Sequence, residues 1–254
     1  MKSFRLPTQS TGIDGVVEER RNLLIATPAV MGALLASPRR LFAALDEAQA
    51  SEQVEQFLEE TAERALELKA DDSASGQEAY LDYIVERSMT VANVPTDNLD
   101  DRSWFDMDPG VYLGVAGRNQ AFFIVHWRFD PHAFLPAHCH PRTSVCTLTV
   151  EGSTVVRHFD VPADAPPYRT DHETEFLIHE TRRVELAAGD TSTLSEHRDN
   201  IHLFEAGPDG ARGTGGTTDY GGDGSFSFLE FDRNRPQDEK TRAFAARWIG
   251  RRLA

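Results

Sequence analysis

The first 95 residues have the hydrophobic pattern of α-helices. A Thr-Pro pair at 27–28 and a Ser-Pro pair at 37–38 each place a capping side chain before a proline that suits the first helical position. Polar residues 70–76 form a break, after which a last helix is predicted over residues 77–91. Before this break, a helix beginning near Ser51 is predicted from positions that recur at steps of three and four: Val54, Phe57, Leu58, Thr61, Ala62 and Ala65.

Residues 96–110 separate this helical region from the rest of the chain. The stretch is rich in Asp, Asn and Pro, which is typical of a linker or a long loop. Trp104 and Phe105 within it indicate a loop that is packed down rather than free.

From residue 111 the pattern changes to short strands, rich in β-branched and aromatic residues and bounded by Gly, Pro or Asp. The predicted strands are Val111–Ala116, Gln120–Phe129, Ser144–Val150, Thr154–Val161, Glu175–Ile178, Arg183–Ala187, Thr191–Leu194, Ile201–Glu205 and Ser225–Phe231. So many short strands at close spacing predict a sandwich or closed barrel over residues 111–235.

Two later segments interrupt the strand pattern. Residues 206–224 are rich in glycine, which predicts a flexible excursion between two strands. Tyr220 in this excursion is a candidate cover for a pocket, although a mobile solvent loop is favoured. The segment 236–254 is predicted to form a C-terminal helix with three large apolar residues on one face: Phe244, Trp248 and Ile249.

Among the nine histidines, His138 and His140 form the most informative pair. Residues two apart on a strand point to the same face, so both imidazoles can enter the interior of a barrel. Neutral imidazoles in that interior need hydrogen bonds or a metal ion. A His-x-His pair alone is a weak signal, because surface pairs are more common than metal sites.

The surroundings of this pair add a second signal. The run 135–141 is followed by a strand and a glycine turn at Gly152, twelve residues after the second histidine. Further along, Ala188-Gly189-Asp190 precedes another strand and then the segment 197–205, which contains His202. These two segments resemble the two-part signature of the cupin family, whose second segment contributes the third histidine.

This resemblance implies a mainly β fold, a cupin double-stranded β-helix (jelly-roll barrel) with an N-terminal α-helical region. It also implies that His138, His140 and His202 are metal ligands and catalytic residues. Many cupins add a glutamate ligand four or five residues after the second histidine, where this chain has Ser144 and Val145. A three-histidine set without that glutamate resembles the thiol dioxygenases: cysteamine dioxygenase, the plant cysteine oxidases and cysteine dioxygenase.

Details of the sequence narrow this resemblance. Residues 196–202 are similar to the cysteamine dioxygenase stretch around its third histidine, and Pro141 fits the same subgroup. Cysteine dioxygenase holds its substrate carboxylate with an arginine on an early strand, and the matching segment 111–116 has none. Free cysteine is therefore not the expected substrate. Cys146 lies one place from the cysteine that couples to a tyrosine in that enzyme, so no crosslink is assigned to it.

The resemblance implies Fe(II) as the cofactor, although imidazole also suits copper, nickel and zinc. Three neutral ligands leave the ion its full charge and open positions for a thiolate and O₂. The expected function is that of a non-haem iron oxidoreductase that adds O₂ to a small thiol and gives a sulfinate. Two alternatives stay open: a metal-dependent cupin lyase, isomerase or non-thiol oxygenase, and a non-enzymatic cupin that binds a small ligand.

Composition and charge restrict the partners. With 26 basic and 41 acidic residues, the net charge of −15 argues against nucleic acid and anionic membranes. Cys139 and Cys146 would lie about 23 Å apart on one extended strand, too far to form a disulfide. Reduced thiols and an N-terminus without the apolar run of a signal peptide predict a cytoplasmic location. The oligomeric state is left undetermined.

Other polar residues have weaker arguments. His126 alternates with Trp127 in a predicted strand, and a satisfied core or surface histidine is favoured over a pocket residue. His197 precedes a turn and is expected to be exposed or to support a ligand. The histidines expected on the surface are His132, His158, His172 and His179. Candidates for substrate contact, with ordinary packing or surface pairing favoured, are Tyr112, Arg128, Arg142 and Arg157.

Overall fold

The computed structural model describes residues 56–57, 59–88, 110–118, 122–166, 173–219 and 227–249. Several sequence predictions fall outside these residues: the helix starts at 27–28 and 37–38, the loop containing Trp104 and Phe105, His172, and Tyr220.

The helical part of the described chain agrees with the sequence pattern. Residues 56–57 and 59–70 are helical, and α4 spans Ala74–Ser88. Ser73 caps α4, because its hydroxyl accepts a hydrogen bond from the backbone amide of Gly76 at 3.2 Å. One apolar cluster attaches both helical segments to the strands, and its buried members are Phe57, Ala65, Leu68, Tyr80, Ile84, Ile124 and Cys146.

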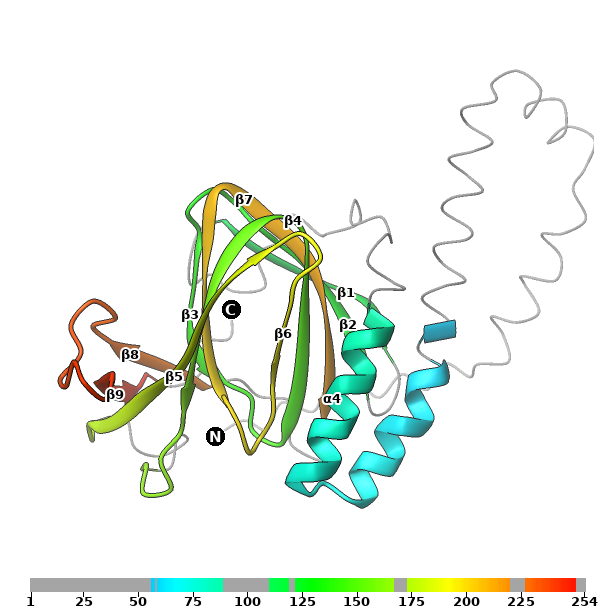
Figure 1. The fold of residues 1–254 in the computed structure, drawn as a ribbon, viewed down its shortest axis with the longest axis horizontal. Coiled ribbons are helices and arrows are strands. Elements are labelled where there is room, and N and C mark those ends of the chain that lie inside the picture. The colour runs from blue at the N-terminus through cyan, green and yellow to red at the C-terminus, as the bar shows by residue number, and fades with distance from the viewer. Residues whose placement is uncertain are drawn as a thin grey trace, which may run out of the picture. The chain divides into compact units, whose positions relative to one another are not determined.

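Nine strands, all paired antiparallel, form the rest of the described architecture. They are β1 (Val111–Arg118), β2 (Phe122–Phe129), β3 (Phe134–Cys139), β4 (Thr143–Asp160), β5 (Phe176–Ala187), β6 (Thr191–Leu194), β7 (Ile201–Asp219), β8 (Ser227–Phe231) and β9 (Ala243–Trp248). The predicted mainly β class, a barrel with a helical region before it, is confirmed (Figure 1).

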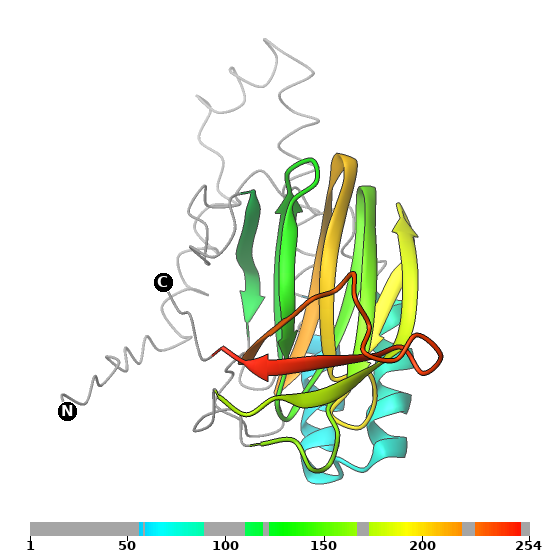
Figure 2. The ribbon, with the colours of Figure 1, turned by 90° about the vertical axis from the view of Figure 1, so that its left-hand side faces the viewer.

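The long strands β4 and β7 pair with each other and pass through two layers of sheet. In one layer, β2 pairs with the second half of β7 and β6 with the first half of β4. In the other, β3 and β5 pair with the remaining halves. Strands β8 and β9 complete a closed ring in the order β7-β3-β8-β9-β5-β4. Figure 2 shows β9 crossing in front of the upright strands, with the helices behind them.

The wall made by β3, β7 and β4 has an apolar core on each side. Trp127, Val156 and Phe204 belong to the core between the two layers. Leu203 and Phe244 belong to the core enclosed by the six-stranded ring. Alternation along β7 therefore sends neighbouring side chains into different cores, and His202 shares the face of Phe204.

Two pairs of predicted strands are in fact continuous, and a further strand, β3, was not in the predicted set. A turn was expected at Gly152, but β4 continues through this residue. The pairing of β4 with β7 shifts in register on both sides of Gly152, so the glycine lies in an irregular part of a continuous strand. Gly152 has a φ of 70°, and a Cβ there would lie 2.1 Å from the carbonyl oxygen of Gly210. β5 likewise joins the segments predicted at 175–178 and 183–187.

The predicted flexible excursion at 206–224 is wrong over most of its length. Residues 206–219 continue β7, which pairs with β2 and β4. Close neighbouring atoms occupy the space that a side chain would need at several of its glycines. A Cβ on Gly213 would lie 2.1 Å from the carbonyl oxygen of Leu148 and 2.3 Å from the indole of Trp127.

The predicted C-terminal helix is also wrong where the chain is described. Residues 243–248 form β9, which pairs with β5 and β8, so the barrel extends beyond the predicted boundary at 235. Phe244 and Trp248 are four residues apart, a spacing that puts them on one face of a helix and equally on one face of a strand. Both are buried in the core of the ring.

Candidate metal centre

The three histidines singled out by the sequence converge in the structure. His138 lies on β3 directly opposite His202 on β7, and His140 follows the end of β3. The Nε2 atom of His202 is 3.0 Å from the Nε2 atoms of both His138 and His140. All three side chains are buried, and together they form a group able to hold a metal ion. Their roles as ligands and catalytic residues stay predictions.

The protonation of His138 follows from its hydrogen bond. Its Nδ1 lies 2.7 Å from the backbone carbonyl oxygen of Pro136, which can only accept, so Nδ1 carries the proton. The lone pair of Nε2 therefore points at the other two histidines. Burial lowers the pKa of His138 to about 4, which keeps the ring neutral near pH 7.

The other two rings are also neutral near pH 7. Burial lowers the pKa of His140 well below its ordinary value, and the neighbouring His138 lowers it further. Burial does the same to His202, with added repulsion from His138, His140 and His158. Three neutral imidazoles that face one another are suitable ligands for a divalent transition metal.

The spacing of the nitrogens fits one shared ion. Metal–imidazole bonds of about 2.1 Å place two nitrogens about 3.0 Å apart at a right angle and about 3.4 Å apart at the tetrahedral angle. The two 3.0 Å separations match the right-angle value. Because His202 Nε2 can carry one proton at most, an ordinary hydrogen bond can satisfy only one of its two contacts.

No carboxylate joins this group among the described residues. Of the two positions where many cupins have a glutamate, Val145 lines the cavity beside the histidines and Ser144 is buried.

A cavity of about 90 Å³ opens beside the three histidines. Most of its wall is apolar, with Trp127 and Phe129 from β2, Phe204 from β7 and Phe228 from β8. Strand alternation explains this wall, since residues 125, 127 and 129 share one face of β2. The cavity is therefore small, largely apolar and in contact with all three imidazoles.

His158 departs from the sequence prediction, which placed it on the surface. It is fully buried on β4, and its ring centre lies 6.1 Å from that of His202. Its Nε2 is 2.7 Å from the hydroxyl of Ser192 on β6. Burial lowers the pKa of His158 to about 4. His158 is outside the three-histidine group. Its contact with Ser192 joins the two layers of sheet.

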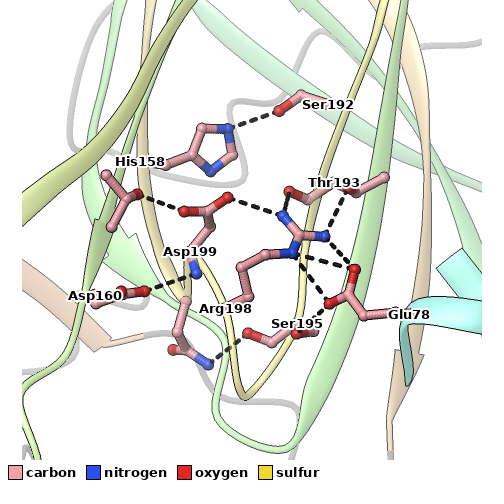
Figure 3. Close-up of polar contacts among 10 residues, drawn as sticks. Glu78, His158, Asp160, Ser192, Thr193, Ser195, Arg198 and Asp199 are labelled. Atoms are coloured by element: carbon pink, nitrogen blue, oxygen red, sulfur yellow. Dashed lines mark hydrogen bonds and ion pairs between the residues drawn. The ribbon is translucent and has the colours of Figure 1, made fainter. Parts of the chain in front are cut away.

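A polar network holds the turn that precedes His202 (Figure 3). The guanidinium of Arg198 binds both carboxylate oxygens of Glu78 on α4, with contacts of 2.9–3.2 Å, and donates to Asp199 at 2.8 Å. Asp199 is buried, accepts a hydrogen bond from the Thr181 hydroxyl, and donates its backbone amide to Asp160 at 2.8 Å. The network therefore connects α4 to the start of β7.

Cys146 does not line the cavity, and no crosslink was assigned to it from the sequence. It packs against the helices, and Ser88 Oγ lies 3.9 Å from its sulfur. Burial raises the pKa of its thiol to about 12. Both Cys139 and Cys146 are free thiols, as predicted.

The remaining candidates do not line the cavity. His126 is buried, and neither of its ring nitrogens has a hydrogen-bond partner among the described residues. His197, His132 and His179 are exposed. Tyr112 donates to Asp130, and Arg128 lies over its ring. The two other arginines form ion pairs, Arg142 with Asp72 and Arg157 with Glu180.

Comparisons with known proteins give a likeness in fold alone. No family model and no curated protein matches the chain. Among solved structures, KdgF from Halomonas sp. matches with a TM-score of 0.33 and 20% identity, over 47% of this chain and 92% of that one. A protein with a double-stranded β-helix domain from Klebsiella pneumoniae gives 0.35 and 14%, over 47% and 84%. The cupin domain of Schizosaccharomyces pombe Cnp3 gives 0.34 and 10%, over 49% and 70%.

In the described part of the chain, none of the helices has the length and apolar character needed to cross a bilayer. The cytoplasmic location stays a prediction, as do the partners inferred from charge.

Proposed function

We propose that this protein is a metal-dependent oxidoreductase that adds O₂ to a small thiol. The observation that carries the proposal is the convergence of His138, His140 and His202 as three buried, neutral ligands without a carboxylate. Iron is the proposed metal, on the basis of the resemblance to thiol dioxygenases. The reaction RSH + O₂ → RSO₂H places both oxygen atoms on sulfur, which loses four electrons.

The neutral donor set supports an anionic co-ligand. A carboxylate ligand would reduce the net positive charge of a bound ion, whereas three imidazoles leave it unchanged. A bound iron ion would supply the activation of O₂ and the deprotonation of the thiol. The carbonyl of Pro136 keeps the Nε2 lone pair of His138 directed at the site.

The apolar wall supports chemistry that is sheltered from water. Trp127, Phe129 and Phe204 line the cavity, and none of its described lining residues is Asp, Glu, Lys or Arg. A thiol held there is close to the ligand positions, so binding replaces a bimolecular encounter.

The test is oxygen consumption by anaerobically Fe(II)-loaded protein with a panel of thiols, followed by mass spectrometry of the products. The proposal predicts O₂ uptake that depends on thiol, with one O₂ consumed per sulfinate formed. His140→Ala is the variant without the site, and His179→Ala, at an exposed position, is the matched control. Stoichiometric metal without thiol-dependent O₂ uptake would support a cupin with other chemistry, and a protein that binds small ligands without metal would support a non-enzymatic role.

A further inference from the structure

We propose that the cavity beside the histidines selects an uncharged ligand with an apolar body and one small polar group. The inference rests on the proposed function, whose substrate it narrows to a neutral small thiol. It excludes both the carboxylate of an amino-acid thiol and the ammonium of an amine thiol.

The cavity wall favours a ligand without a charge. The wall consists of apolar side chains, the three histidines, two threonines and Gly215, with no Asp, Glu, Lys or Arg among the described lining residues. The nearby Arg157 is directed into the other core, where Glu180 and the carbonyl oxygen of Arg233 satisfy it. A charged ligand group would therefore lose its hydration in this cavity without gaining an ionic partner.

The wall also favours one small polar group on the ligand. Thr147 on β4 and Thr217 on β7 line the cavity and are its hydroxyl-bearing side chains among the described residues. In the β4–β7 pairing, Thr217 is opposite Val145 and Thr147 is opposite Gly215, so the two threonines are diagonal neighbours on one face. A ligand hydroxyl or other neutral polar group finds its partner at this pair.

The volume of the cavity favours a small ligand. The cavity of about 90 Å³ has room for only a few non-hydrogen atoms besides those bound at the histidines. Gly215 contributes part of that room: a Cβ there would lie 3.2 Å from the Cys146 carbonyl oxygen and 4.0 Å from Thr147 Oγ1. A side chain at 215 therefore fits with a small adjustment and occupies ligand space. At Gly213, by contrast, a Cβ would clash with backbone and indole at 2.1 and 2.3 Å.

The experiment compares thiols of similar length that differ in charge. The protein is loaded with Zn(II), which has no redox chemistry. It is then titrated calorimetrically with 1-propanethiol, 2-mercaptoethanol, cysteamine and 3-mercaptopropionate. We expect both neutral thiols to bind at least tenfold more tightly than the cationic and anionic ones. In metal-free protein, 1-propanol should raise the thermal midpoint more than propionate or ethanolammonium at equal concentration. Tighter binding of either charged thiol would overturn the inference.

Two cavity variants and one control sharpen the test. Gly215→Val should keep the metal but lose at least tenfold in affinity for both neutral thiols, and Val145→Leu does the same if Gly215→Val does not fold. Thr217→Val should lower the affinity for 2-mercaptoethanol by about three- to tenfold and leave the affinity for 1-propanethiol unchanged. Thr241→Val, at an exposed position away from the cavity, is the control and should change neither. Unchanged binding in a folded Gly215→Val protein would contradict the assignment.

The outcome is separable from that of the proposed function. Tight binding of neutral thiols without O₂ uptake would refute thiol oxygenation and leave the ligand class intact. Efficient O₂ uptake with a charged thiol preferred would refute the ligand class and leave the oxygenase intact.

Discussion

Two polar groups lie within a few residues of each other, one in the turn before β7 and one around His202 on β7, and they differ in how their atoms are satisfied. Around Arg198 and Asp199, each donor faces an acceptor: a guanidinium meets a carboxylate, and a carboxylate meets a hydroxyl. Around His202, its Nε2 atom lies 3.0 Å from the Nε2 atoms of both His138 and His140, and a proton is available for only one of these two contacts. The first group pairs donors with acceptors, and the second directs ring nitrogens toward one point.

This difference indicates separate roles. A satisfied network fixes geometry, and its loss is expected to appear in stability. A group of converging lone pairs is expected to bind a cation, and its loss should appear in metal content. Substitutions around Asp199 should therefore lower stability, whereas substitutions of the three histidines should lower metal content.

The largest effect is expected from His202→Ala. Removing one of three ligands leaves a pair too weak to keep iron through purification, so metal content should fall from near one ion per chain to near zero. In metal-free protein, the loss of stability should be within about 1–3 kcal/mol. His197→Ala is the matched control, because this histidine is exposed. Iron retained in the His202 variant, or lost from the control, would show that the third ligand lies elsewhere.

The next effect is expected from Asp199→Ala and should appear in stability alone. The change removes an acceptor of the Thr181 hydroxyl and one of the acceptors of Arg198, and it places Ala at a φ of 56°. We expect a loss of about 2–4 kcal/mol in the free energy of unfolding, measured by denaturant titration. Metal content of the folded fraction should stay near one ion per chain. Loss of metal with unchanged stability would reverse the two roles.

An intermediate effect is expected from pH. Burial lowers the pKa of His138 and of His158 to about 4 in the folded chain, below about 6.5 in the unfolded chain. Between these values the unfolded chain binds more protons, so stability should be fully present above pH 6.5 and should fall as pH falls toward 4. Thermal midpoints of metal-free protein across this range test the prediction. His158→Gln should flatten the slope, and an unchanged slope would remove His158 as a contributor.

The smallest effect is expected from Glu78→Gln. The side chains of Arg198 and Glu78 are 36% and 45% exposed, so solvent screens much of their attraction. Stability should fall by about 1 kcal/mol or less, because the amide still offers one acceptor. Asp72→Asn, in the similarly exposed pair with Arg142, is the control and should have no larger effect. A loss above about 2 kcal/mol would mean that α4 contributes more to the position of β7 than the contacts indicate.

The three-histidine group could be predicted because two short sequence segments carry it. The two-residue step from His138 to His140 predicts their common face, and the resemblance of the second segment to the cupin signature implied His202. The position of Cys146 was left open by the sequence, and the structure places it against the helices.

The burial of His158 could not be predicted, because the second half of β4 has an apolar core on each side. Val156 enters one core and Phe159 the other, so the strand lacks the alternation of polar and apolar residues that marks an exposed face. The glycines of β7 were misleading for a related reason. Their composition is typical of a flexible loop. Position 213 requires a glycine, however, because the indole of Trp127 occupies the space where a side chain would lie.

The most direct test of the account is an anaerobic Fe(II) titration of the metal-free protein, followed by desalting and metal analysis. We predict saturation at one ion per chain, with the iron retained after desalting, because His138 on β3, His140 directly after β3 and His202 on β7 supply three neutral ligands. A folded protein that takes up no iron, or that binds it equally well when all three histidines are replaced by alanine, would contradict the central claim.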